Sequence, residues 1–242
     1  MILCVLCSVM AAPAGLAAVL AEAARPLVMT QILSSQFCLG QKFFTAKLSP
    51  YNPEMKLALA QINPTVGDVA YNTQLILEGI DQARTAAADL VIFPELAVVG
   101  YPPKDLLLKP DVLHQCEKAM NLIASHCVDI AGVVGYPAYN AAALCVDGAM
   151  CDRRIKSLLP TYDVFDETRY FEPGPAVQVT PWHRSDGTTV NLGISVCEDL
   201  WNDPDMFERQ LYHDNPIDAL AEAGAELFIN CSASPFVLNK HD

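Results

Sequence analysis

From Met55 onward, short apolar segments of strand length alternate with longer segments whose apolar residues recur at helical spacing. Asp147-Gly148 adds a hairpin signal, and Asn72 is a start signal for the first helix. Strands that alternate with helices and also form hairpins indicate an α/β layered fold with a mixed sheet. The pattern predicts strands near residues 56–62, 90–93, 130–135, 142–146, 150–158, 177–180, 190–196 and 226–230, and helices near 72–87, 111–126 and 217–223.

Residues 1–54 lack this alternation. The first 20 residues are apolar but are interrupted by Pro13 and Gly15, which makes them a poor membrane span. A signal peptide is a second interpretation, although no basic residue precedes Arg25. We interpret residues 1–54 as an extension or linker in front of a natural start at Met55.

The net charge of the chain is −13, from 15 Lys and Arg against 28 Asp and Glu. This acidity argues against non-specific binding to nucleic acid or to an anionic membrane surface. The nine cysteines are odd in number and scattered, and Cys4 and Cys7 form a C-x-x-C pair without a second pair to complete a zinc site. We therefore expect no metal site, and a reducing, cytoplasmic location in which most cysteines are small buried side chains.

Three apolar segments end next to residues that can carry chemistry. Glu95 follows one segment as either a turn cap or a general base, and Cys197 follows another as either a buried thiol or an exposed nucleophile. Lys156 lies on the predicted strand 150–158, where it alone reads as a residue of a solvated edge. Catalytic groups gather where strands end, so these three residues are candidates for one site.

Together the segments around these residues resemble the nitrilase, or carbon-nitrogen hydrolase, superfamily. The matching motifs are FPEL at 93–96, IKSLLP at 155–160 and GISVCED at 193–199. The flanks GYPPKDLL at 100–107, YDVFDETRYF at 162–171, CEDLW at 197–201 and NCSASPF at 230–236 are similar to the glutaminase domains of glutamine-dependent NAD(+) synthetases. The resemblance begins at Met55 and implies a four-layer α-β-β-α sandwich.

The resemblance also implies roles for individual residues. Cys197 is the expected nucleophile, Glu95 the acid and base, and Lys156 the cation that stabilises the oxyanion. Glu167 is expected to hold Lys156 in place. The residues expected to bind or line the site for glutamine are Tyr101, Tyr162, Phe165, Ser234 and Lys240.

Two departures from the family pattern limit these expectations. The family domain continues beyond Phe236, whereas this chain stops at Asp242, so we expect the hydrolase domain over 55–242 to lack its C-terminal part. A synthetase would also carry a Ser-Gly-Gly phosphate loop, which this sequence does not contain. ATP, Mg and deamido-NAD are therefore expected to belong to a separate synthetase domain or subunit, and the amidase step is expected to need no cofactor.

Three functions remain open at this point. The first is a glutaminase that supplies ammonia for NAD(+) synthesis, with L-glutamine and a synthetase as partners and a homo-oligomeric assembly. The second is a stand-alone amidase acting on another small amide or carbamoyl compound. The third is an inactive fragment that keeps the three catalytic residues in an unfinished sheet.

Overall fold

The computed structural model describes residues 3–11, 42–47, 55–175, 177–202 and 211–235. Within these ranges the helices are α2 (Val69–Thr85), α3 (Pro110–His126) and α4 (Pro216–Glu222), with short 3-10 segments η1 (Lys104–Leu108), η2 (Glu167–Arg169) and η3 (Cys197–Leu200). The strands are β1 (Leu3–Ala11), β2 (Lys42–Lys47), β3 (Lys56–Gln61), β4 (Leu90–Ile92), β5 (Ala131–Tyr136), β6 (Ala141–Val146), β7 (Ala149–Ile155), β8 (Thr180–His183), β9 (Thr189–Val196) and β10 (Leu227–Pro235).

These strands form two mixed sheets. The six-stranded sheet has the order β2-β3-β4-β5-β6-β7, in which β3, β4 and β5 are parallel and the outer neighbours are antiparallel. The four-stranded sheet has the order β1-β10-β9-β8, in which only β9 and β10 are parallel. The hairpin signal is confirmed, since Val146 pairs with Ala149 and both turn residues have positive φ.

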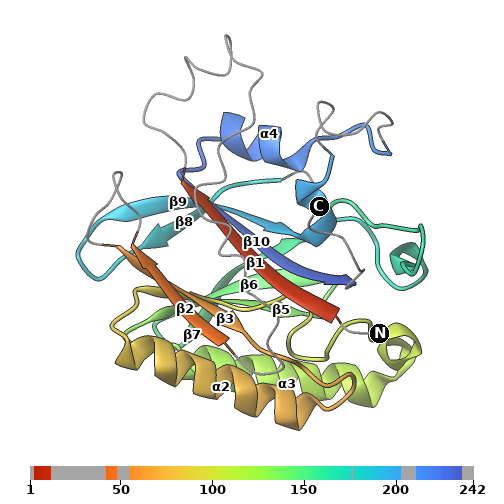
Figure 1. The fold of residues 1–242 in the computed structure, drawn as a ribbon, viewed down its shortest axis with the longest axis horizontal. Coiled ribbons are helices and arrows are strands. Elements are labelled where there is room, and N and C mark those ends of the chain that lie inside the picture. The colour runs from red at the N-terminus through yellow and green to blue at the C-terminus, as the bar shows by residue number, and fades with distance from the viewer. Residues whose placement is uncertain (1–2, 12–41, 48–54, 176, 203–210, 236–242) are drawn as a thin grey trace.

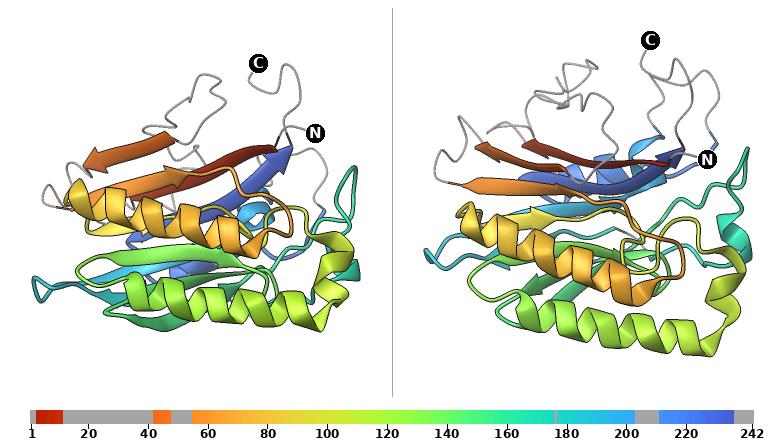
Figure 2. Two further views of the ribbon diagram at one scale, coloured as in Figure 1. Left: turned by 90° about the horizontal axis from the view of Figure 1, so that it is seen from below. Right: turned by 60° about the horizontal axis from the view of Figure 1, so that its bottom comes forward.

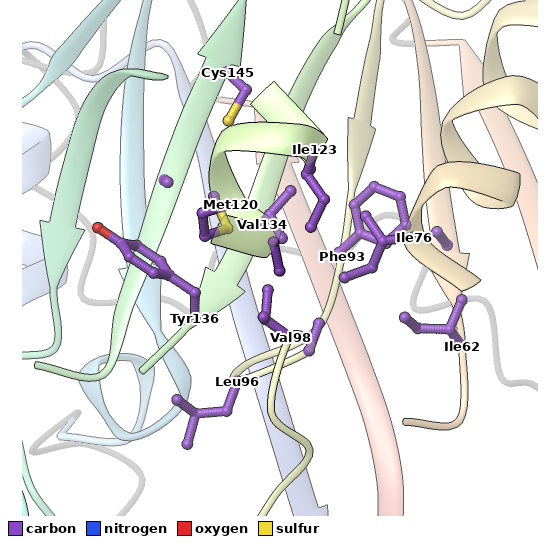
Figure 3. Packing of buried hydrophobic residues seen from close by; sticks show 14 of the residues in the cluster. Ile62, Ile76, Phe93, Leu96, Val98, Met120, Ile123, Val134, Tyr136 and Cys145 are labelled. Carbon is purple, nitrogen blue, oxygen red and sulfur yellow. The ribbon is translucent and has the colours of Figure 1, made fainter. Parts of the chain in front are cut away.

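Helices cover the outer faces of the two packed sheets. Figure 1 shows α2 and α3 on one side of the molecule and α4 on the other, and in Figure 2 α2 and α3 run side by side. One apolar cluster packs α2 and α3 on the six-stranded sheet through residues such as Ile76, Phe93 and Ile123 (Figure 3). A second cluster fills the space between the sheets, and a third packs α4 through Leu220 against Phe228. The predicted four-layer α-β-β-α sandwich is confirmed.

Several boundaries differ from the sequence-based expectation. The first helix begins at Val69, because Asp68 caps it, while the side chain of Asn72 binds the backbone of Thr65. The strand expected at 177–180 begins only at Thr180, since Val177 and Val179 pack in the α4 cluster. The strand expected to run to residue 158 ends at Ile155, so Lys156 directly follows it.

Part of the segment before Met55 belongs to the sheets. β1 pairs with the whole of β10, from Leu3 opposite Pro235 to Ala11 opposite Leu227, and β2 pairs with β3. Figure 1 shows β1 lying alongside β10 at the edge of the four-stranded sheet. Among the described residues, no helix is both long enough and apolar enough to cross a membrane.

Candidate active site

Glu95 lies just after β4, where the backbone passes very close to β5. A Cβ on Gly135 would stand 2.2 Å from the carbonyl oxygen of Pro94 and 2.8 Å from the Cα of Glu95, so only glycine fits there. The Glu95 side chain is buried. Its Oε1 accepts hydrogen bonds from Lys156 Nζ and Asn140 Nδ2, both at 2.8 Å, and its Oε2 accepts one from the Ala233 N–H at 3.1 Å.

Lys156 is fully buried and makes ion pairs with two carboxylates. Its Nζ lies 2.8 Å from Oε1 of Glu95 and 2.8 Å from Oε2 of Glu167. Burial alone lowers the pKa of Lys156, but its electrostatic interactions, first with Glu95 and then with Cys197 and Glu167, raise that pKa well above its ordinary value. Lys156 is therefore a permanent cation inside the molecule.

Glu167 opens η2 and is the second carboxylate of this group. Tyr101 donates a hydrogen bond from its hydroxyl to Glu167 Oε1 at 2.8 Å. Burial and the charge of Glu95 raise the pKa of Glu167 to about 7, against the opposing effects of Lys156 and Tyr101. Two carboxylates thus share one lysine, and the raised pKa of Glu167 is the cost of keeping both in one buried place.

Asn140 is a site residue that the sequence reasoning missed. Its side-chain amide Nδ2 donates to Glu95 Oε1 at 2.8 Å and to Glu167 Oε2 at 3.2 Å, and its backbone carbonyl accepts from the Lys156 backbone N–H at 3.0 Å. The backbone of Asn140 is left-handed, with φ at 51°. Asparagine is enriched in that conformation, so an Asn just before the predicted strand 142–146 was the available signal.

Cys197 follows β9 at the start of η3, and its backbone is also left-handed, with φ at 46°. This conformation after a buried strand lifts the side chain out of the line of the strand on a strained turn, although Cys197 itself is buried. Burial and the charge of Glu95 raise the pKa of the Cys197 thiol, whereas Lys156 and a hydrogen bond with Ser232 lower it. The resting group is the thiol, so attack requires a base to take its proton.

Ala233 on β10 connects this cysteine to the carboxylate cluster. Its N–H binds Glu95 Oε2, and its carbonyl oxygen lies 4.0 Å from Cys197 Sγ. Asn230, also on β10, donates to the carbonyl of Cys197 at 3.3 Å and to Ser195 Oγ at 3.0 Å. Through Ala233, the four-stranded sheet therefore links Cys197 to Glu95 of the six-stranded sheet.

The two acidic residues after Cys197 are both buried, and the sequence reasoning assigned neither of them a role. Glu198 accepts hydrogen bonds from the hydroxyls of Tyr162, at 2.7 Å, and Tyr212, at 3.1 Å. Within the described part of the chain, the hydrogen-bond donors to Asp199 are the backbone N–H groups of Val196, Ser157 and Leu158. The sequence shows that Glu198 and Asp199 directly follow Cys197, but it does not show that they are buried.

The residues expected to bind substrate lie in different parts of the site, and one of them lies outside the described residues. Tyr101 and Phe165 line a pocket of about 240 Å³ that reaches Glu167 and extends between η1 and η2. Tyr162 stacks edge-on against Phe165, with ring centroids 5.6 Å apart, and reaches Glu198 beside the nucleophile. Ser234 is on β10 next to Ala233, and Lys240 lies outside the described residues.

The comparisons with a family model and with known proteins agree with each other. Residues 56–240 match the carbon-nitrogen hydrolase family model. Glutamine-dependent NAD(+) synthetases from Synechocystis and Aquifex aeolicus are 39% and 40% identical over 76% and 77% of this chain. The chain spans 35% and 31% of those two proteins, about a third of their length.

Solved structures show the same fold. The glutamine-dependent NAD(+) synthetase from Acinetobacter baumannii, in complex with ADP, is 32% identical with a TM-score of 0.64, over 82% of this chain and 34% of its own. An amidase from Nesterenkonia is 24% identical with a TM-score of 0.58, over 74% of this chain and 64% of its own, which shows similarity of fold alone. With the family model covering most of its length, this chain belongs to the carbon-nitrogen hydrolase family.

Proposed function

We propose that the protein hydrolyses the side-chain amide of L-glutamine through a thioester on Cys197. The observation that carries this proposal is the left-handed Cys197 at the end of β9, whose thiol is coupled electrostatically to the buried Glu95–Lys156 pair. Its similarity to glutamine-dependent NAD(+) synthetases supports glutamine as the amide.

In the first half of the reaction, Glu95 takes the proton of the Cys197 thiol as the sulfur attacks the amide carbon. The new S–C bond gives a tetrahedral oxyanion. When the C–N bond breaks, Glu95 returns the proton to the leaving nitrogen, which departs as ammonia. In the second half, Glu95 takes a proton from water as the water oxygen attacks the thioester carbon. The C–S bond then breaks, Glu95 returns the proton to the sulfur of Cys197, and glutamate leaves.

Lys156 stabilises the oxyanion, together with the backbone N–H of the residue after Cys197. Glu95 and Glu167 hold its ammonium in place, so little reorganisation is needed when negative charge develops on the substrate. Glu167 acts in this proposal as a positioning residue, and Asn140 orients both carboxylates.

The surroundings of Glu198 favour an amino-acid amide over a simple amide. This carboxylate is buried close in sequence to Cys197, and among the described residues its hydrogen-bond donors are the phenols of Tyr162 and Tyr212. A substrate with an α-ammonium group would place a positive charge beside Glu198, and Tyr162 would line the same position. A plain aliphatic amide would bring no charge to this carboxylate.

We further infer that the ammonia serves glutamine-dependent NAD(+) synthesis in a homo-oligomeric assembly. ATP, Mg and deamido-NAD would then be bound by a synthetase domain or subunit, and not by the residues of this site. In this proposal residues 55–242 form the hydrolase unit, and residues 1–54 are an addition to it.

The proposal is tested by measuring ammonia and glutamate release from glutamine by the full chain and by Cys197→Ala and Cys197→Ser. We expect both variants to lose activity by at least about 10³-fold while the circular dichroism spectrum is unchanged. Parallel assays with asparagine, propionamide and N-carbamoyl amino acids identify the substrate class. Activity that survives in either variant contradicts the nucleophile, and a preference for propionamide contradicts the role given to Glu198.

A further inference from the structure

Asp199 lies two residues after the nucleophile and is 2% exposed. Its Oδ2 accepts a hydrogen bond from the Val196 N–H at 3.0 Å, which closes the turn that carries Cys197. Its Oδ1 accepts two more, from the N–H groups of Ser157 and Leu158, each at 2.9 Å. These three bonds satisfy an ionised carboxylate with backbone donors alone.

The three bonds join two distant parts of the chain. Ser157 and Leu158 directly follow Lys156 at the end of the six-stranded sheet, whereas Val196 directly precedes Cys197 at the end of the four-stranded sheet. The partners of Oδ1 are 42 and 41 residues away from Asp199 in the sequence. One carboxylate thus ties the backbone that carries the cation to the backbone that carries the nucleophile.

The side-chain ammonium of Lys156 is held separately from its backbone. Glu95 and Glu167 bind its ammonium, and both belong to segments at the end of the six-stranded sheet or its connecting loops. Those bonds fix Lys156 relative to the base. The bonds of Asp199 fix the lysine-bearing backbone relative to Cys197.

Keeping this carboxylate buried has a cost. Burial raises the pKa of Asp199 to about 6, although its backbone hydrogen bonds and the charge of Lys156 lower it. An uncharged residue would avoid that cost, and a cap for a four-residue 3-10 turn alone needs only the bond to Val196. The two long-range bonds therefore call for a role beyond closing the turn.

We propose that Asp199 is a positioning residue that sets the placement of Lys156 against Cys197 and thereby controls how readily the thiol is activated. This inference rests on the proposed function for its turnover measurement. It does not need glutamine for its second measurement, the alkylation of Cys197.

Two variants separate the contributions of Asp199. Asp199→Asn keeps an oxygen for Ser157 and Leu158 but places an amide opposite the Val196 N–H, and it removes the charge. Asp199→Ala removes all three acceptors. We expect kcat for glutamine to fall about 100-fold in Asp199→Ala and about tenfold or less in Asp199→Asn, with KM changed by less than about threefold in both.

The second measurement follows iodoacetamide labelling of the peptide that contains Cys197 by mass spectrometry, over a series of pH values. If Asp199 positions Lys156, the labelling profile of Asp199→Ala moves to higher pH, because the thiolate loses part of its neighbouring positive charge. The profile of Asp199→Asn should lie between those of Asp199→Ala and the unchanged protein. Labelling profiles that coincide in all three proteins overturn the proposal, whatever the substrate proves to be.

Ile123→Ala is the control for lost stability, because Ile123 is fully buried on α3 in a different apolar cluster from that of Cys197. It should lower the urea concentration at the midpoint of unfolding and leave the labelling profile unchanged. If Asp199→Ala fails to fold, Asp199→Asn alone decides the question through its profile. If Ile123→Ala shifts the profile as much as the Asp199 variants do, the effect is general destabilisation and the proposal fails. If the unchanged protein does not hydrolyse glutamine but the profiles separate as expected, the proposed substrate is wrong and the positioning role stands.

Discussion

The two sheets bring very different groups to the same site. The six-stranded sheet ends in Glu95 and Lys156, which are buried and bonded to each other, and both have further polar partners. The four-stranded sheet ends in Cys197, whose backbone is left-handed and whose thiol pKa is raised by burial and by Glu95. One end is a closed network of charges, and the other is a strained turn with a protonated nucleophile.

The two sheets therefore provide different parts of the proposed chemistry. Acid, base and oxyanion chemistry need groups that do not reorganise, and a buried network of ion pairs and hydrogen bonds provides them. A nucleophile needs to stand clear of its strand, and a strained turn provides that. The meeting of the two ends, through Ala233 and Asp199, makes the charge network act on the thiol.

The largest effect is expected when the charged end loses its base. Glu95→Gln keeps the size of the side chain but removes the group that accepts the proton, so kcat should fall by about 10³-fold or more. The exposed Glu226, which binds the Asn191 N–H, gives the control variant Glu226→Gln, whose kcat should be unchanged. Steady-state kinetics with both variants test this, and a Glu95→Gln enzyme within tenfold of full activity would show that another group is the base.

Glycines at the two ends allow a comparison of backbone tolerance. A Cβ on Gly135 would meet backbone atoms around Glu95 at 2.2 and 2.6 Å, whereas one on Gly193 would meet the side chains of Ala225 and Phe228 at 3.0 and 3.1 Å. We expect Gly135→Ala to lower the free energy of unfolding by about 3 kcal/mol or more and Gly193→Ala by about 1 kcal/mol, because side chains adjust more easily than backbone. Urea unfolding of both variants measures this. Equal losses would mean that the backbone at Glu95 is not confined.

The sequence revealed only part of each end. Glu95 and Cys197 could be found because each follows an apolar segment, whereas Lys156, on a charge-rich segment, was identified through the family motif IKSLLP. The roles of Asn140 and Asp199 could not be predicted, because they depend on burial and on bonds to residues far away in the chain. The pairing of β1 with β10 was missed for the same reason, since no local pattern in residues 1–54 indicates which sheet edge they join.

The crowding of carboxylates at the charged end should appear as a pH-dependent stability. The pKa of Glu167 rises from an ordinary value of 4.5 to about 7 in the folded protein. Between those pH values Glu167 holds a proton in the folded chain that it has lost in the unfolded chain. The stability that this protonation contributes is therefore complete below pH 4.5 and is lost as the pH rises through about 7. Glu167→Gln has no such proton. The Tm of the unchanged protein should therefore fall relative to that of Glu167→Gln across this window, and a constant difference would contradict the raised pKa.

The smallest expected effect tests the strain at the other end. With φ at 46°, Cys197 occupies a conformation that costs a residue with a Cβ roughly 1–2 kcal/mol, and glycine avoids this cost. Cys197→Gly should therefore be as stable as Cys197→Ala or more stable, by up to about 1 kcal/mol, although glycine gains more entropy on unfolding. Val196, one residue earlier with φ at −127°, is the matched control. At that position Val196→Ala should be more stable than Val196→Gly. Urea unfolding measures the stabilities of the four variants. If glycine is the more stable residue at position 197 and alanine at position 196, the strain lies at the nucleophile. If alanine is the more stable residue at both positions, the turn holds Cys197 without strain, and its reactivity comes from the charges of the other sheet alone.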